Sequence, residues 1–265
     1  TGTSWSKHWR RPVQAPTSRK RPPVPDQRRA ALEVCVDTPA GVVSGADPNI
    51  DRIELCSALD VGGLTPSAGL LDLSRAIADK VHVMIRPRSG GFVYSPQEID
   101  LMCRDIQAVR RAGLAGVVVG AADGTGHLDL PVLKTFVDEA GDLDVTLHRV
   151  VDTLDDPLSA VDIAKELGVR RILSSGGAVH AVEGVACLAQ MQAQAEGAVE
   201  IMAGSGITPL SIGPIAAATG LRDFHGSFAV KSPSHGSDPM GFGTGAGRAP
   251  EPGQVATARG VRDQP

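Results

Sequence analysis

The sequence predicts an α/β protein whose single domain closes into a (β/α)8 barrel, and three observations favour this fold. Short runs rich in β-branched residues alternate with longer amphipathic segments, which is the pattern of repeated βα units around a parallel sheet. The length of 265 residues is close to the roughly 250 that such a barrel needs. The first run, LEVCVDTPAG, lacks the GxGxxG loop that usually follows the first strand of an open, doubly wound sheet.

Eight runs have the length and composition of buried parallel strands. They cover residues 32–36, 52–56, 81–86, 116–120, 144–149, 171–175, 199–204 and 221–226. Closing these strands into a barrel leaves no edge of the sheet exposed.

Helix-like stretches lie between most of these strands. They cover residues 66–78, 95–112, 130–140, 157–167, 181–194 and 209–218. The segment Ser95-Pro96-Gln97-Glu98 supplies a cap residue, a first-position proline and an acidic first turn in the order that starts a helix. Thr208-Pro209 repeats the first half of this signal.

The two ends of the chain differ in composition from the barrel. Residues 1–30 are rich in Arg, Lys and Pro without a helical or strand period, and we expect a disordered basic arm. The barrel then spans residues 31–230. Residues 231–265 form a segment rich in Gly and Pro, so the eighth helix is degraded or reduced to the short stretch VATARGVRDQ, residues 255–264.

Composition excludes several classes of function. The net charge of -4 and the 3% of aromatic residues give neither attraction nor stacking surfaces for nucleic acid. No apolar run approaches the roughly 20 residues of a membrane span. Four cysteines without CxxC spacing, and no apolar signal segment, predict free thiols in a reducing cytoplasm.

Polar residues at the carboxyl ends of the strands form the candidate site, because barrel proteins bind their ligands there. The first two strands both contain Glu-x-Cys, so Glu33 and Cys35 share one strand face, as do Glu54 and Cys56. Neighbouring thiolates suit a soft ion such as copper(I). The alternative is that the cysteines only fill the core, as buried cysteines commonly do.

Basic residues end other strands and face these acids in the predicted barrel. Arg86 ends the third strand and Arg88 follows it, His148 and Arg149 end the fifth, and His225 lies at the end of the eighth. Buried carboxylates need such partners. Glu33, Glu54, Arg86, Arg88 and Arg149 are therefore expected to form a charge network, which serves either the stability of the barrel or ligand binding.

The last units carry a second candidate site, for an anion. Gly204, Ser205 and Gly206 follow the seventh strand, and Gly226 and Ser227 follow or end the eighth. Backbone amides at these positions are the usual phosphate site of such barrels. The alternative is that the glycines only make tight turns. Glu54, His148 and Arg86 are the candidates for catalytic residues, while no strand lysine and no HExxH motif support Schiff-base or zinc chemistry.

Several phrases of the sequence resemble one family. LEVCVDT, DRIELCSALDVGGLTPSAGLL, VMIRPRSGGFVYSPQEI, VTLHRVVD, RILSSGG and IMAGSGI, within residues 31–230, are similar to the CutC copper homeostasis proteins. The resemblance implies a (β/α)8 barrel, a cytoplasmic location and a role in copper homeostasis. It also implies that Cys35 and Cys56 match the proposed copper(I) ligands.

Two functional hypotheses follow. In the first, the protein binds copper(I) through Cys35 and Cys56, with Glu33, Glu54 and Arg86 setting the local charge. In the second, it is an enzyme acting on a small anionic or phosphorylated substrate, with His148 or Glu54 as general base. The expected ligand is thus a copper ion or a small anion, and the sequence is compatible with a homo-oligomer.

Overall fold

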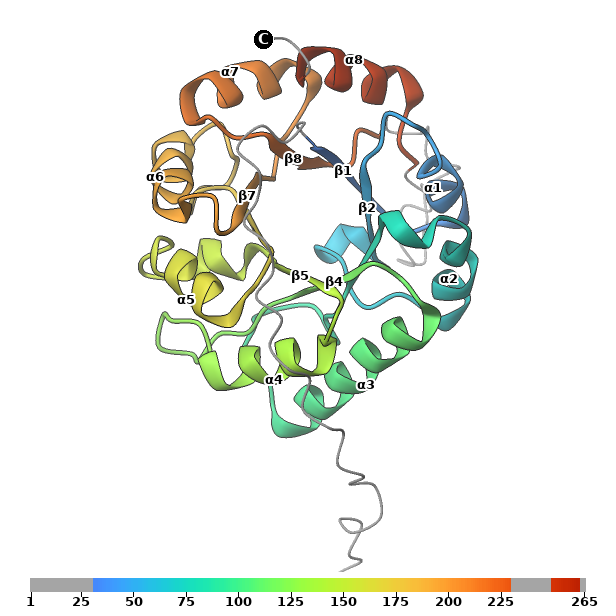
Figure 1. Ribbon diagram of the computed structural model, residues 1–265, viewed down its shortest axis with the longest axis vertical. Helices are drawn as coiled ribbons and strands as arrows, with labels where there is room; N and C mark the ends of the chain where they lie inside the picture. The colour runs from blue at the N-terminus through green and yellow to red at the C-terminus, as the bar shows by residue number, and fades with distance from the viewer. Residues whose placement is uncertain (1–30, 230–248, 263–265) are drawn as a thin grey trace, which may run out of the picture.

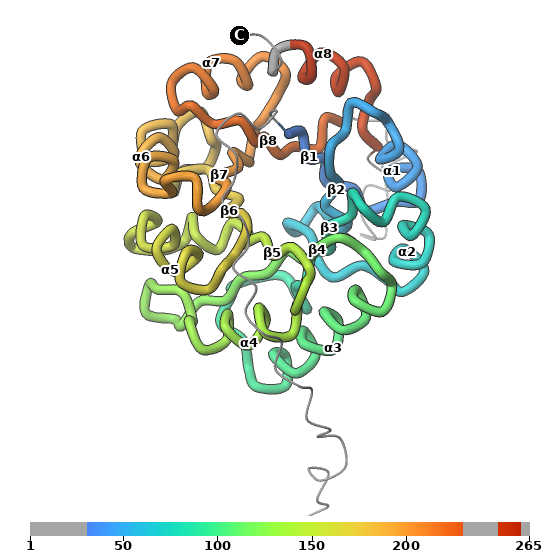
Figure 2. Tube along the Cα trace, in the orientation of Figure 1, coloured from blue at the N-terminus to red at the C-terminus, as the bar shows by residue number. Residues whose placement is uncertain are grey.

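Eight parallel strands close into a barrel in the computed structural model, which describes residues 31–229 and 249–262. The strands are β1 (Ala31–Val36), β2 (Arg52–Leu55), β3 (Val81–Met84), β4 (Gly116–Val119), β5 (Asp144–Leu147), β6 (Arg171–Ser174), β7 (Glu200–Ala203) and β8 (Asp223–Gly226). Each pairs with its neighbours in chain order, and β8 pairs with β1 (Figures 1 and 2). The predicted barrel is confirmed, and every strand lies within its predicted run or extends one residue beyond it.

Helices surround the barrel on the outside (Figure 1). They are α1 (Pro39–Ser44), α2 (Ala68–Leu73), α3 (Pro96–Ala112), α4 (Leu130–Ala140), α5 (Ser159–Leu167), α6 (Val185–Ala195), α7 (Pro209–Thr219) and α8 (Pro252–Arg262). Apolar side chains of the outer strand faces, such as Leu32, Ile53 and Leu147, are buried between the sheet and these helices.

The predicted start of α3 is confirmed in detail. The Ser95 hydroxyl accepts a hydrogen bond from the Glu98 amide at 3.3 Å, and the Glu98 carboxylate accepts one from the Ser95 amide at 2.7 Å. This reciprocal pair satisfies two amides that a helix N-terminus otherwise leaves without partners. Gly113 ends the helix with φ of 73°, a left-handed conformation that glycine adopts without strain.

Two short helical segments differ from the expectation. The sequence predicted one helix over residues 66–78, but α2 ends at Leu73 and the 3-10 helix η2 (Ser74–Lys80) follows it. Ile77 has φ of -131° and breaks the helical course inside η2. The six-residue α1 was not predicted at all, because PAGVVS is too short to show a helical period.

The register of the strands decides which side chains point into the barrel. Parallel partners share a face, and Cys35 pairs with Glu54, which in turn pairs with His82 of β3. The same alternation places Arg52, Arg171, Glu200 and Asp223 on the inner face of the barrel. All four are buried, and Arg171 forms an ion pair with Glu200.

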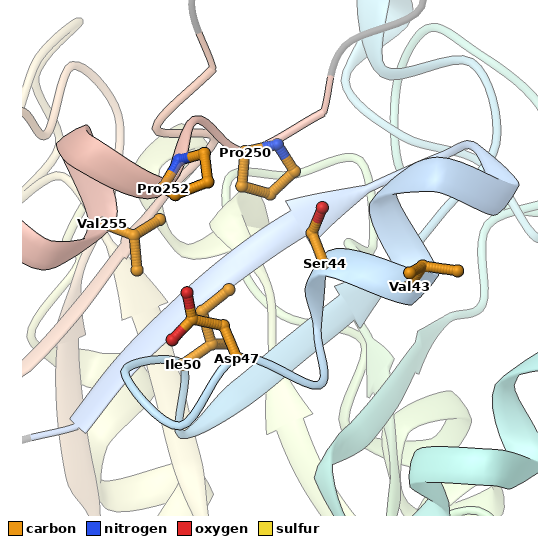
Figure 3. Close-up of a pocket in the computed structure, with 7 residues that line it drawn as sticks. All are labelled: Val43, Ser44, Asp47, Ile50, Pro250, Pro252 and Val255. Atoms are coloured by element: carbon orange, nitrogen blue, oxygen red, sulfur yellow. The ribbon is translucent and has the colours of Figure 1, made fainter.

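The eighth helix, which the sequence left in doubt, forms as α8 and lies beside α7 (Figure 1). Its Val255 and Ala258 are buried. Arg259 donates to the carbonyl of Asn49 at 3.1 Å and forms an ion pair with Asp51. Figure 3 shows Val255 and two prolines across from Ile50, around a hollow of about 150 Å³. The chain thereby fixes its last helix against the turn that precedes β2.

Other expectations fall at the ends of the chain. The basic arm, residues 1–30, and most of the Gly-rich stretch, residues 230–248, lie outside the described residues. No helix within the described ranges has both the length and the apolar character that crossing a membrane requires.

Candidate functional site

A cavity of about 550 Å³ opens at the carboxyl ends of the strands. Its wall includes Cys35 from β1, Glu54 from β2, Arg86 after β3, His148 after β5 and His225 from β8. This is the end of a parallel barrel at which ligands bind, and the volume lies in the range of about 300 to 1,000 Å³ that small-molecule sites occupy.

His225 lies between two glutamates on one wall of this cavity, which we call the acidic wall (Cys35, Glu54 and His225). Its Nδ1 is 2.7 Å from Glu33 Oε1, and its Nε2 is 3.7 Å from Glu54 Oε2. Glu33 is fully buried and also forms an ion pair with Arg52. Ion pairs therefore connect Glu33, Glu54 and His225 across the neighbouring strands β1, β2 and β8.

These contacts shift the pKa values of all three groups. Burial alone would raise the pKa of Glu33, but Arg52 and His225 bring it well below its usual range. Burial raises the pKa of Glu54, and the neighbouring Glu33 adds to this effect. Burial opposes the charged form of His225, yet Glu54, Cys35 and Glu33 together raise its pKa well above the usual range. Glu33 is therefore ionised, and His225 carries the compensating positive charge.

The two predicted metal ligands have different surroundings. Cys35 lines the cavity beside His225, whose pKa it helps to raise. Cys56 is fully buried, with its sulfur 3.6 Å from Glu54 Oε2. Burial, Glu54 and Cys35 raise the pKa of the Cys56 thiol well above its usual range, so it is protonated in the absence of a metal.

Cys56 packs beside Met84, a second sulfur-containing side chain. It forms a small buried cluster with Met84 and Val118. Gly63 closes over this cluster, and a Cβ at that position would lie only 2.9 Å from the Cys56 sulfur. Met84 itself lines the cavity. Three sulfur atoms thus gather around the ends of β1, β2 and β3.

A second possible set of metal ligands, made of oxygen and nitrogen atoms, also lies within the described residues. Glu33, Glu54 and His225 offer ligand atoms that all lie within 4.8 Å of one another. Glu33 already accepts hydrogen bonds from Arg52 and from His225 Nδ1. It therefore serves as a partner that orients His225 and leaves Nε2 and Glu54 nearer to the cavity.

The opposite wall, which we call the basic wall, contains Arg86, Phe92, His148 and Arg149. Arg86 donates to the carbonyls of Val61 at 2.9 Å and Gly90 at 2.8 Å, and its guanidinium lies 5.1 Å from the centre of the Phe92 ring. These contacts fix its charge beside the cavity.

Comparison with known proteins assigns the chain to a family. The model of the CutC family matches residues 30–230. A CutC family protein of Caulobacter vibrioides is 46% identical over 220 residues, covering 81% of this chain and 89% of the relative. A second, from Sinorhizobium medicae, is 41% identical and covers 89% of this chain and 97% of the relative.

A solved structure agrees with these relatives. The crystal structure of a Streptococcus agalactiae CutC, assigned to copper homeostasis, superposes with a TM-score of 0.71 at 29% identity. It covers 75% of this chain and 98% of that protein. The chain belongs to the CutC family.

The structure separates residues that the sequence grouped together in this CutC protein. Of the five expected in one charge network, Glu33 and Glu54 meet through His225, and Glu33 also forms an ion pair with Arg52. Arg88 instead forms an ion pair with Glu98, at the start of α3. Arg86 bonds to backbone carbonyls, and Arg149 forms an ion pair with Asp152. The arginines differ from the expectation because other acceptors are nearer: Arg149 finds one three residues along the chain, Arg88 finds one on α3, and Arg86 finds carbonyls in its own loop and in the segment after β2.

The residues expected to bind an anion are also only partly placed as the sequence of this CutC protein predicted. The Gly204 amide donates to the Ser174 carbonyl at 3.0 Å, so it is not placed as a loop donor. The other four expected residues line the cavity: Ser205, Gly206, Gly226, which ends β8, and Ser227. Ser205 takes φ of 75° and donates its hydroxyl to the Val179 carbonyl at 2.7 Å.

Several functional neighbours were missed in the sequence of this CutC protein. Arg52, the main partner of Glu33, stands two residues before Glu54 on the same strand face. Strand alternation could have identified it. His225 was noted only as a strand-end base, and its bridging position depends on β8 pairing with β1, which no local pattern reports.

Proposed function

We propose that this CutC protein acts in cytoplasmic copper homeostasis and binds copper(I) through the thiolates of Cys35 and Cys56. The observation that supports this most strongly is the gathering of sulfur atoms beside the cavity. Cys35 and Met84 line the cavity, and Cys56 packs against Met84. Thiolate and thioether sulfurs are the donors that copper(I) prefers.

The strand register sets the geometry that the two thiolates must reach. Cys35 pairs with Glu54, so Cys56 lies two residues further along the neighbouring strand. Strand spacing and rise place the two Cα atoms about 8 Å apart. Both side chains then have to lean toward one another to share an ion, and Cys56 would give up its present hydrogen bond to Glu54.

Deprotonation of the buried thiol accompanies binding. The raised pKa of the Cys56 thiol means that copper(I) must displace its proton, so affinity increases with pH. Glu54 is the nearest acceptor for that proton, and its pKa is raised by burial.

A direct titration tests the proposal. Copper(I) is added anaerobically to the reduced full-length chain in competition with a chromogenic chelator. We expect one tightly bound ion in the native protein and none in the double variant Cys35→Ser/Cys56→Ser. The matched control is Cys103→Ser/Cys187→Ser, which removes two half-buried thiols on α3 and α6. Unchanged binding in the Cys35/Cys56 variant would refute the assignment of ligands.

A further inference from the structure

The basic wall contains a buried donor without an acceptor in the described part of the chain. His148 is only 3% exposed, and its Nε2 has no hydrogen-bond partner there. Its Nδ1 accepts a hydrogen bond from the Val150 amide at 3.1 Å. The neutral ring must therefore carry its proton on Nε2, as an N–H donor.

The surroundings keep this ring neutral and fixed. Burial and the charge of Arg86 lower the pKa of His148 to about 3. The ring stacks at a tilt on Phe92, with 4.9 Å between the ring centres. A Cβ on Gly120 would lie 2.4 Å from His148 Cε1, so only glycine leaves room for the ring at this place. The ring is thus held in one position in the wall of the cavity.

Charge on the same wall favours an anion. Arg86 and Arg149 both line the cavity, and the Arg149 side chain is 40% exposed although it forms an ion pair with Asp152. The carboxylate nearest to the cavity, Glu54, belongs to the opposite, acidic wall. A cavity of about 550 Å³ is also far larger than a single copper ion needs, and it matches a small organic ligand.

We propose that the basic wall binds an oxyanion, the carboxylate or phosphoryl group of a small metabolite, with His148 Nε2–H donating to one of its oxygens and Arg149 balancing its charge. This site is separate from the sulfur atoms at β1 to β3 and does not depend on copper. It differs from the glycine loops expected from the sequence, because it uses side chains at the end of β5. The orphaned donor gains the acceptor that a buried N–H requires.

The test uses the metal-free, full-length chain with 15N-labelled histidine. Inorganic phosphate and glycolate are titrated separately, each against sodium chloride of equal ionic strength, and the His148 Nε2 resonance is followed by NMR. We expect a saturable shift with at least one of the two anions. Phosphate alone points to a phosphoryl group and glycolate alone to a carboxylate.

Variants then assign the contact. His148→Phe removes the donor, and we expect the dissociation constant to rise at least tenfold, the usual effect of losing a hydrogen bond to a charged group. Arg149→Gln should weaken binding as well. His127→Phe, on an exposed loop, is the matched control and should bind as the native chain does. If neither anion shifts Nε2 saturably, the proposal is overturned. It is equally overturned if a folded His148→Phe binds unchanged, and the native titration decides alone should that variant not fold.

Discussion

Replacing Arg52 by methionine would remove the main partner of a fully buried carboxylate. Glu33 lies inside the barrel with no exposed surface, and Arg52 is the residue that forms the close ion pair with it. The positive field of Arg52 is also the largest influence opposing the effect of burial on the pKa of Glu33. In Arg52→Met, the hydrogen-bonded partner that Glu33 keeps among the described residues would be His225.

The expected loss of stability is large. Removing one partner of a buried ion pair costs about 3–5 kcal/mol, because the remaining charge stays in a low-dielectric interior. For a domain of this size each kcal/mol shifts the melting temperature by about 2–4 °C, so Arg52→Met should melt roughly 6–20 °C lower. The remaining Glu33 should also take up a proton more easily, which links the loss to pH.

Urea unfolding at pH 7, followed by circular dichroism, measures this directly. Arg104→Met is the control, since Arg104 and Asp100 form an ion pair in which both side chains are about two-thirds exposed. Adding Glu33→Gln to Arg52→Met should recover part of the lost free energy of unfolding. A loss no greater than that of the Arg104 control would show that Glu33 does not depend on Arg52.

Three further outcomes follow from the same structure. His148 has a folded-state pKa of about 3 and an unfolded value of about 6.5. The unfolded chain therefore binds more protons between these values, and stability falls as the pH drops. From pH 7 to pH 5 the free energy of unfolding should fall by about 2 kcal/mol through His148 alone. Urea titrations at the two pH values should therefore show a fall that is smaller by about 2 kcal/mol in His148→Gln than in the native chain. An equal fall in both proteins would contradict the low pKa of His148. Gly120→Ala would place a Cβ 2.4 Å from His148 Cε1 and should cost about 1–3 kcal/mol in calorimetry, whereas Gly91→Ala, which meets open space, should cost little. Val255→Asp buries a charge beneath α8 and should lower the melting temperature markedly, while the exposed neighbour in Ala256→Asp should not; similar melting of both would argue against the packing of α8.

The fold was predictable because the strand and helix patterns of the local sequence are those that a (β/α)8 barrel requires. Most βα units repeat the same alternation of β-branched and amphipathic segments, and α3 carries a complete start signal at Ser95 and Glu98. The exceptions are short or irregular elements. Six residues suffice for α1 because Thr38 caps it, and the kink at Ile77 depends on packing that no periodicity reveals.

The candidate site was only partly predictable. Alternation placed Glu33, Cys35 and Glu54 on the inner face correctly, and Cys56, just after β2, is buried beside Met84. The partners of charged residues depend on contacts between distant strands, such as His225 with Glu33, which are 192 positions apart in the chain. The partners of Arg86 depend on the conformation of the loops around it. Arg86 bonds to carbonyls of its neighbouring loops, and no pattern in the sequence specifies that choice.

X-ray absorption at the copper edge tests the central proposal most directly, because it reports the atoms bound to the ion itself. In the copper(I)-loaded native chain we predict a first shell made of sulfur, with two thiolates from Cys35 and Cys56. Cys35→Ser/Cys56→Ser should retain no copper and therefore show no sulfur shell, whereas in Cys103→Ser/Cys187→Ser the shell should be unchanged. A native shell of nitrogen and oxygen alone would contradict the proposal and would point to His225 and Glu54 instead.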